Sequence, residues 1–551
     1  MSIYTAPGVY INESDQTEQK AGIATSVACV VITSSKGPVD RRVLCKTPQE
    51  YITTFGSPDP AMGEGYFAQI SALAFLAEGR NLLVTRVHNG AIYGGVRFIE
   101  DQDAQGNNAL SGKLVPLSTF NLEDPYADDT VYTETDAFTI YDYSPGVNDI
   151  RIKLTPNTTT QDGGFYVNVF SPSDASSPIE KYLVSLTYKL NGMGEQMFIE
   201  DHINLRSKTV VVRVNNGPEG FNYQDQDTPL DDNLVFNAAP ESLVANFASG
   251  SVGGPVSPAQ VITGYGLYEV KESSNTNIII NGGWSDLGVK REIARIADAR
   301  RAMAILDIPI SRQRRDLAVD WRKNTLNLDN NHAALYTPWL KVTDINNNTN
   351  IWAPPSGFVA ATYARTDADF AAWFSPAGMN RGDLNGGIGS SGTVLGVKEI
   401  YSLADQEEFK DAQINPILSI PGYGIKIWGD YTLQTRNSML SYIPVRRMLD
   451  YVENSMEISL RFSNFDPNDD ILRSQLVTDV EAFLDPIKTG RGLEAYSVVS
   501  DESNNPKDRI AAGELRVSAA MTPVSTARVI ILDAILTKSG ADFSESVQAA
   551  L

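Results

Sequence analysis

The sequence predicts a multidomain protein of mixed α and β structure, in which α/β core domains carry an inserted, mainly β domain. Three observations support this prediction. The chain has 551 residues, which is more than one hydrophobic core normally serves. Strand-like and helix-like runs alternate over 277–307, as they do in a parallel α/β sheet. Residues 91–262, in contrast, contain short β-like runs separated by turn sequences.

Apolar periodicity places the elements of the predicted core. Apolar side chains recur at helical spacing in the predicted helices and form short, bounded runs in the predicted strands. The helices are predicted at 64–79 and 287–300, and the strands at 27–32, 82–87, 277–281 and 302–307. A strand, a helix and a strand at this spacing form a βαβ unit, so we expect a partly parallel sheet. We expect 21–90 and 263–400 to share this domain and 91–262 to interrupt it.

The last third of the chain is also mixed. Helices are predicted at 405–413, 444–457 and 470–485, and strands at 424–428, 494–499, 514–519 and 527–536. In the helix 470–485 the apolar residues lie on one face, and Pro486 follows them. Because proline disrupts a helix interior, we expect Pro486 to end this helix.

Net charge and composition exclude several classes of function. The chain carries 45 basic and 67 acidic residues, a net charge of −22, and this argues against broad nucleic-acid binding and against binding to anionic membranes. Residues 91–262 hold 9 basic and 23 acidic residues, so this segment supplies most of the excess and is expected to face solvent. Two cysteines predict reduced thiols. We find no apolar run of 18 residues and no signal sequence at Met1, so we expect no membrane insertion.

A search for chemical motifs finds no catalytic or cofactor site. The three histidines are isolated in sequence, and we find no HExxH, GxSxG or Walker A pattern. The glycine-rich stretch 386–392 lacks the GK[ST] ending of a phosphate loop. Residues 101–106 begin like a calcium loop, but Gly112 occupies the position of the required glutamate. Arg381-Gly382-Asp383 is expected to form an ordinary turn. We therefore expect no enzyme activity, no cofactor and no metal.

Both ends of the chain contain short β-compatible runs without a core of their own. An isolated strand cannot satisfy its own backbone groups, so it must pair with its own sheet or with that of a neighbour. Frayed termini are the alternative. The residues concerned are Pro7, Gly8, Val9, Tyr10 and Ile11 at the start, and Phe543, Ser544, Glu545 and Val547 at the end.

Several short motifs follow one another in a fixed order. They are PGVY at 7–10, NLLVTRV at 81–87, PAGMNRG at 376–382, INPI at 414–417, PGYG at 421–424, WGDYTL at 428–433, YIPVRRM at 442–448 and DESNNP at 501–506. In this order they resemble the contractile tail sheath proteins of myoviruses, most closely the T-even-like type. The resemblance is close over 1–90 and 370–551, loose over 263–369, and absent from the insertion.

The resemblance implies mixed α/β sheath core domains with an outer insertion and terminal strand-exchange arms. The implied segments are an N-terminal linking arm 1–20, a discontinuous middle domain 21–90 plus 263–400, an outer domain 91–262, an inner domain 401–536 and a C-terminal linking arm 537–551. It also implies assembly as stacked hexameric rings around a tail tube, with baseplate and tail terminator proteins as further partners. The protein would assemble in the host bacterial cytoplasm and end in the virion.

Two pairs of basic residues are candidate contacts in such an assembly. Lys488 and Arg491 follow the helix 470–485 and would contact an acidic tube surface, or else remain solvated charges at a helix C-terminus. Arg446 and Arg447 would pair with acidic residues of a neighbouring subunit or, as the alternative, with acidic residues of their own domain.

Two other classes of protein are alternatives. A sheath of another contractile injection system, such as a tailocin or a secretion sheath, would share the mechanism. A secreted adhesin or glycan hydrolase would need a secretory signal or an identifiable site, and we find neither.

Overall fold

Two units make up the chain, and each is described by itself. The computed structural model describes residues 26–528, apart from 80, 92, 103–107, 115–135, 147–149, 158–163, 172–176, 215–242, 248–250 and 385–393. The larger unit is Ile23–Tyr451, and the smaller one contains 452–528. The predicted arm residues at both ends, and most of the predicted strand 527–536, lie outside the described residues.

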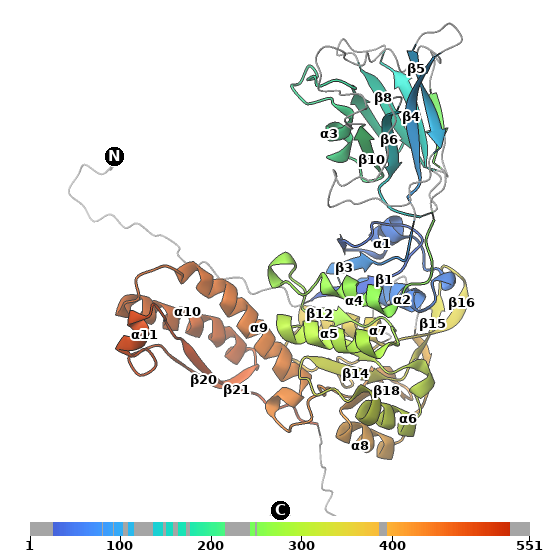
Figure 1. Ribbon diagram of the computed structural model, residues 1–551. Helices are drawn as coiled ribbons and strands as arrows, with labels where there is room; N and C mark the ends of the chain where they lie inside the picture. The colour runs from blue at the N-terminus through green and yellow to red at the C-terminus, as the bar shows by residue number, and fades with distance from the viewer. Residues whose placement is uncertain are drawn as a thin grey trace, which may run out of the picture. The chain divides into compact units, whose positions relative to one another are not determined.

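An eight-stranded sheet forms the centre of the larger unit (Figure 1). Its strand order is β19-β18-β14-β13-β12-β1-β3-β2. The six central strands are parallel, and β19 and β2 add antiparallel edges. The strands are β1 (Val27–Ile32), β2 (Arg42–Cys45), β3 (Asn81–Arg86), β12 (Ile278–Ile280), β13 (Met303–Asp307), β14 (Ala333–Thr337), β18 (Ile414–Ile420) and β19 (Gly424–Ile427).

The predicted βαβ unit is confirmed. β12 and β13 pair in parallel with Ile278 opposite Met303, and the helix α5 (Leu287–Arg300) connects them with the predicted bounds. Asp286 caps this helix by accepting a hydrogen bond from the Val289 amide, 3.0 Å away. The mixed α/β multidomain fold class is therefore confirmed as well.

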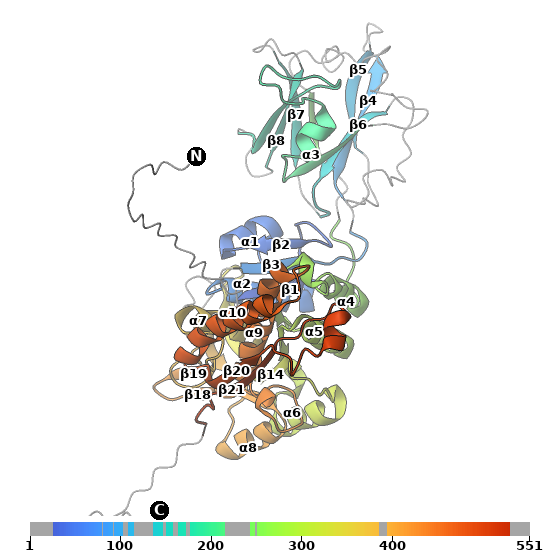
Figure 2. The same ribbon diagram turned by 90° about the vertical axis from the view of Figure 1, so that its left-hand side faces the viewer.

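Helices cover both faces of this sheet. α2 (Glu64–Leu76) packs with α7 (Ser356–Asp369), and α4 (Pro258–Gly266) packs with α5; Figure 2 shows the two pairs on opposite sides of the sheet. α2 is buried on almost every side, as expected of a helix that is apolar all round. This unit also contains the helices α1 (Pro48–Phe55), α6 (Arg315–Asp320) and α8 (Leu403–Asp411) and a π-helix (Trp321–Leu326). A separate small sheet is formed by β15 (Leu340–Asp344), β16 (Thr349–Ala353) and β17 (Val394–Val397).

The predicted boundary at 400 is wrong, because the large sheet continues beyond it. β18 pairs in parallel with β14, with Ile414 opposite Leu335, and this pairing buries Ile414 and Ile417 completely. The larger unit consequently extends to Tyr451. β18 therefore belongs to the larger unit, because burial in the parallel sheet stabilises it there, although it lies in the last third of the chain.

The insertion contains two four-stranded antiparallel sheets. Their orders are β10-β6-β4-β5 and β11-β7-β8-β9, and their inner faces and α3 (Ile199–Asn204) share one hydrophobic core, as in a β-sandwich. Beside this sandwich, the buried Arg86 donates hydrogen bonds to the carbonyls of Gly37 and Pro145, each at 2.6 Å. The strands are β4 (Gly95–Gln102), β5 (Asn108–Leu114), β6 (Asp136–Asp142), β7 (Arg151–Pro156), β8 (Phe165–Phe170), β9 (Glu180–Val184), β10 (Val210–Val214) and β11 (Leu243–Asn246).

The smaller unit is built on two long helices and a two-stranded sheet. α9 (Ile443–Leu460) begins in the larger unit and ends in this one, and it is followed by α10 (Asp470–Thr489), β20 (Leu493–Val499), α11 (Lys507–Ala511) and β21 (Ser518–Pro523). The prediction that Pro486 ends α10 is wrong, because the helix includes it. Ile487 is buried one residue later, and this apolar burial stabilises the last turn despite the missing N–H.

A buried carboxylate joins several elements of the larger unit. The Asp307 side chain, at the carboxyl end of β13, accepts hydrogen bonds from Asn281 Nδ2 at 3.0 Å, from the Gly283 amide at 3.1 Å and from the Ser356 amide at 2.8 Å. Lys290 of α5 donates to Asn281 Oδ1 at 3.3 Å. Burial raises the pKa of Asp307 and lowers that of Lys290 to about 8.

The Asp307→Ala substitution should destabilise the larger unit by about 3 kcal/mol or more, because it leaves several buried donors without an acceptor. Urea unfolding of the full chain measures this loss. The matched control is Asp316→Ala, since Asp316 is 63% exposed and pairs with Arg315 at the surface; its effect should be below about 1 kcal/mol. Equal unfolding midpoints for both variants would contradict the assigned role of Asp307.

Candidate functional site

Within the described residues, the sheet of the smaller unit consists of two strands with unpaired outer edges. β20 and β21 pair antiparallel, with Val499 opposite Ser518 and Tyr496 opposite Met521. Among the described residues, neither strand pairs with a third. Each strand therefore presents a row of backbone donors and acceptors at its outer edge, which is the arrangement that accepts a strand from another segment or another chain.

The faces of this sheet are also incompletely covered. Of the thirteen positions in the two strands, Leu493 alone is buried, whereas Ser518, Ala519 and Ala520 of β21 are all exposed. An isolated two-stranded sheet is only marginally stable in water. As far as the described residues extend, the sheet is thus a two-stranded pair to which a further strand could be added.

The helix α10 packs against β20, the first strand of this sheet. The Tyr496 hydroxyl of β20 donates a hydrogen bond of 2.5 Å to Asp485 Oδ1 of α10. This hydrogen bond raises the pKa of Tyr496 to about 12. The apolar face of α10 is buried through Leu476, Val480, Leu484 and Ile487. β20 is therefore fixed to a well-packed helix by a side chain as well as by the backbone.

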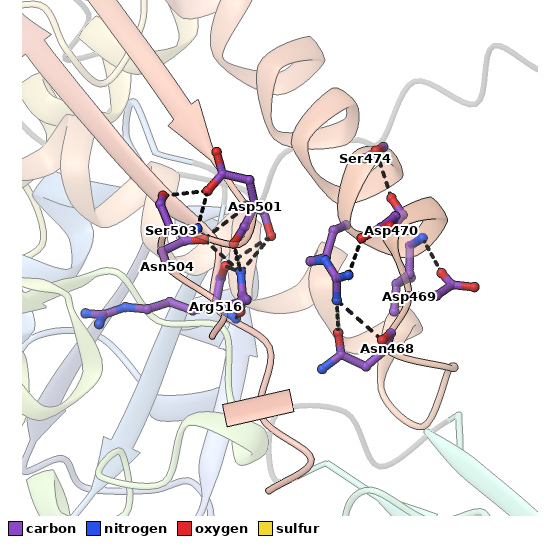
Figure 3. Close-up of polar contacts among 12 residues, drawn as sticks. Asn468, Asp469, Asp470, Ser474, Asp501, Ser503, Asn504 and Arg516 are labelled. Carbon is purple, nitrogen blue, oxygen red and sulfur yellow. Dashed lines mark hydrogen bonds and ion pairs between the residues drawn. The ribbon is translucent and has the colours of Figure 1, made fainter. Parts of the chain in front are cut away.

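The connection from β20 to β21 is stabilised by a polar turn (Figure 3). Asp501 accepts from the Ser503 amide at 2.8 Å, and Asn504 Nδ2 donates to the Val499 carbonyl at 2.8 Å. Asn505 is 1% exposed and exchanges two hydrogen bonds with the Arg516 backbone, at 2.9 Å to its carbonyl and 2.6 Å from its amide. The DESNNP motif thus joins the end of β20 to the chain that leads into β21.

Lys488 and Arg491, the predicted tube contacts, are both exposed at the C-terminal end of α10. The Lys488 ammonium lies 5.6 Å from the centre of the Tyr496 ring, a cation–π contact that orients the side chain. Arg491 has a φ of +67° and follows the helix end. The two residues are therefore near each other and solvent-accessible, as a contact with a partner requires.

Arg446 and Arg447, the predicted inter-subunit residues, are each 5% exposed and pair within the chain. Arg446 Nη2 lies 2.7 Å from Asp450 Oδ1, one helical turn further along α9. Arg447 donates to both carboxylate oxygens of Asp367, at 2.9 and 2.5 Å. The intramolecular alternative accounts for these contacts, and pairing with a neighbouring subunit stays a prediction.

Other motifs of the sequence have structural roles. Arg381 donates to the Ser375 carbonyl at 2.7 Å, and Asp383 pairs with Lys426 at 2.7 Å, so the Arg-Gly-Asp tripeptide belongs to a packed turn beside β19. Within the described part of the chain, no three His, Cys, Asp or Glu side chains group closely enough to hold a metal ion. No described helix is long and apolar enough to cross a bilayer.

The sequence did not identify one exposed apolar segment of the smaller unit. Phe462 is 85% exposed and Phe465 is fully exposed in the loop between α9 and α10, and Ile471 at the start of α10 is 76% exposed. Phe465 also has a φ of +74°, which is unusual for a bulky residue. Two phenylalanines in a polar loop give no periodic signal, so only the structure reveals their exposure.

Comparisons with known proteins place this surface in a recognised domain. Residues 435–537 match the phage tail sheath C-terminal domain. The chain is 29% identical over 224 residues to the tail sheath protein of Vibrio phage KVP40, covering 41% of this chain and 32% of that protein. It is 27% identical over 320 residues to the tail sheath protein of Enterobacteria phage T4, covering 53% of this chain and 47% of that protein. The chain thus spans one third to one half of these relatives.

Solved structures share the fold. The sheath tail protein Lin1278 from Listeria innocua superimposes with a TM-score of 0.55 at 12% identity, over 91% of this chain and 96% of that one. The contracted helical sheath of the anti-feeding prophage gives 0.52 at 15% identity, over 97% and 100%.

The fold of the described residues is that of solved sheath proteins. The C-terminal domain is of the phage tail sheath type, and the chain is a relative of the contractile tail sheath proteins, so the resemblance is confirmed.

The Arg447→Met substitution should destabilise the larger unit by about 3–5 kcal/mol, because it leaves the buried Asp367 carboxylate without its partner. Chemical unfolding measures the change. Arg295→Met is the control, since its side chain is 49% exposed in surface pairs with Glu269 and Glu292, which contribute about 1 kcal/mol or less. A loss below about 1 kcal/mol for Arg447→Met would show that the buried pair is not important for stability.

Proposed function

We propose that this protein is the structural subunit of a contractile phage tail sheath. In this proposal the subunits stack as hexameric rings around the tail tube and contract to drive the tube through the host cell envelope. The observation that carries the proposal is the open β20–β21 sheet inside the segment that matches the sheath C-terminal domain. The role is structural rather than enzymatic, because interfaces formed on contraction would supply the energy.

The terminal arms are the proposed strands that complete this sheet in neighbouring subunits. Pro7–Ile11 and Phe543–Val547 each have the length of one short strand. Strand addition needs only backbone groups at an open edge. Four or five backbone hydrogen bonds at about 1 kcal/mol each give several kcal/mol for each arm. Such links would persist while the subunits rotate, with Ser14–Gly22 and Ser539-Gly540 as hinges.

The remaining partners follow from the same proposal. The sheath would contact the tail tube on its inner side, the baseplate at one end and the tail terminator at the other. The location would be the virion, after assembly in the host bacterial cytoplasm. A sheath from another contractile injection system remains the second candidate, because the anti-feeding prophage sheath shares the fold; attachment of the assembled tail to a DNA-filled head distinguishes the two.

Deletion of residues 1–20 or 537–551 should abolish ordered assembly while leaving the folded chain intact, because each deletion removes one proposed linking strand. Negative-stain microscopy is done on each purified protein, with and without tail tube. Striated tubes of uniform width should form from the intact chain and not from the deletion variants. Circular dichroism controls for folding. Striated tubes from both deletion variants would contradict the role of the arms, and an intact chain that stays monomeric even with tube present would contradict the sheath function itself.

The double substitution Lys488→Glu/Arg491→Glu should prevent assembly around the tube, because it reverses the charge that an acidic tube surface would bind. Co-sedimentation with purified tube measures the effect. Lys410→Glu is the matched control, since Lys410 is also an exposed lysine in the last turn of a helix. Normal assembly of the double variant would exclude this tube contact.

A further inference from the structure

The connection between β20 and β21 is unusually long for neighbouring antiparallel strands. It covers 500–517 and includes the short helix α11, whereas hairpin connections usually have about 2–5 residues. A long connection does not determine where the second strand begins. The position of β21 must therefore be fixed by other contacts.

The faces of β21 supply few such contacts, one of which is a hydrogen bond of 3.1 Å from Asn504 Nδ2 to Ser518 Oγ. Register is strongly specified where one face of a strand is buried, because a slip by one residue moves every side chain to the opposite face. In β21, however, no residue is fully buried, and the first three are exposed. Small side chains at Ala519 and Ala520 distinguish the two faces poorly. The backbone ladder with β20 alone would leave neighbouring registers close in free energy.

Asn468 attaches this connection to the start of α10. Its Nδ2 donates a hydrogen bond of 2.9 Å to the carbonyl of Glu514, four residues before β21 begins. Its Oδ1 accepts from Arg473 Nη1 at 2.8 Å. Arg473 is itself 7% exposed and pairs with Asp470. The amide of Asn468 thus links a buried arginine of the helix to the backbone that enters the strand.

Hydrogen bonds hold the start of α10 in place, so it can serve as the fixed point. Asp469 caps the helix by accepting from the Leu472 amide at 2.8 Å, and Ser474 donates to the Asp470 carbonyl at 2.8 Å (Figure 3). Two residues after Glu514, the Arg516 amide donates to the buried Asn505. Asn468 and Asn505 therefore hold the same short segment from two sides, one from α10 and one from the DESNNP turn.

We propose that Asn468 is a positioning residue that sets the register of β21 and with it the backbone groups offered at the open edge of the sheet. This inference rests on the proposed function, because the edge matters only if strands of other subunits are added there. Along the outer edge of an antiparallel strand, alternate residues direct their N–H and C=O groups outward. A slip by one residue therefore changes which residues can pair with an added strand. Without the hydrogen bond from Asn468, Asn505 would hold the segment from one side alone, and β21 would sample neighbouring registers more often and accept arms less well.

The test uses the full chain with the substitution Asn468→Asp. This variant keeps the oxygen that accepts from Arg473 but loses the Nδ2 donor to Glu514, so it removes one link and preserves the other. Ser474→Ala is the control, because it removes an exposed side-chain hydrogen bond on the same helix without touching the connection. Hydrogen exchange and assembly are measured on the same samples.

We expect amide exchange in 516–523 to become about five- to tenfold faster in Asn468→Asp, as for the loss of one hydrogen bond, while exchange in 476–487 stays unchanged. The protein concentration needed for tube assembly should rise by a similar factor. Ser474→Ala should match the intact chain in both measurements. Asn468→Ala, which loses both links, should show a larger change in the same direction.

Three results would overturn the inference, and they are separable from failure of the proposed function. Unchanged exchange in 516–523 would show that the Asn468 hydrogen bond does not hold β21, and faster exchange there with normal assembly would exclude the positioning role of Asn468. Faster exchange throughout α10 would show that Asn468 acts only in folding. If the intact chain itself does not assemble, with or without tube, the proposed function fails, whereas the exchange experiment still tests the effect of Asn468 on β21.

Discussion

The larger unit depends on one buried carboxylate. Asp307 lies where β13 ends, and its oxygens accept hydrogen bonds from the turn after β12 and from the first residue of α7. The Ser356 hydroxyl adds a further donor at 2.6 Å, and Lys290 binds the same group of polar atoms from α5. The carboxylate therefore connects two strands to helices on both faces of the sheet. In many α/β proteins this edge binds a ligand, whereas here side chains of the chain itself occupy the polar groups.

The smaller unit follows the opposite principle. Within the described residues, its sheet has two strands with unpaired outer edges, an exposed β21 and a long connection. Side-chain amides of Asn468 and Asn505 hold that connection. Such a sheet gains stability when strands are added, because added strands satisfy backbone groups and cover the exposed faces. In the proposed function, the larger unit would move as a rigid body and the smaller unit would supply the link between subunits.

Sequence reasoning identified the elements whose pattern is local. The helix α5 has the predicted bounds 287–300, because its cap at Asp286 and its apolar spacing lie in one stretch of sequence. The membership of β18 in the large sheet was missed, because parallel pairing with β14 joins residues far apart in sequence. The prediction that Pro486 ends α10 is wrong because burial of Ile487 in the folded chain outweighs the tendency of proline to end a helix. Asn468 gave no signal at all, since its role depends on a carbonyl that only the fold brings near.

The uneven distribution of charge along the chain also bears on how the protein could assemble. A net charge of −22 opposes self-association through ordinary surface contacts, and the insertion alone contributes 23 acidic against 9 basic residues. Backbone hydrogen bonds, however, are made between neutral groups, so the addition of a strand to β20 or β21 does not require oppositely charged surfaces to meet. Repulsion between the acidic insertions is screened over about 8 Å at physiological ionic strength. If the proposed strand addition links the subunits, neutral backbone edges would allow this acidic protein to assemble, and the acidic segment would keep separate assemblies apart.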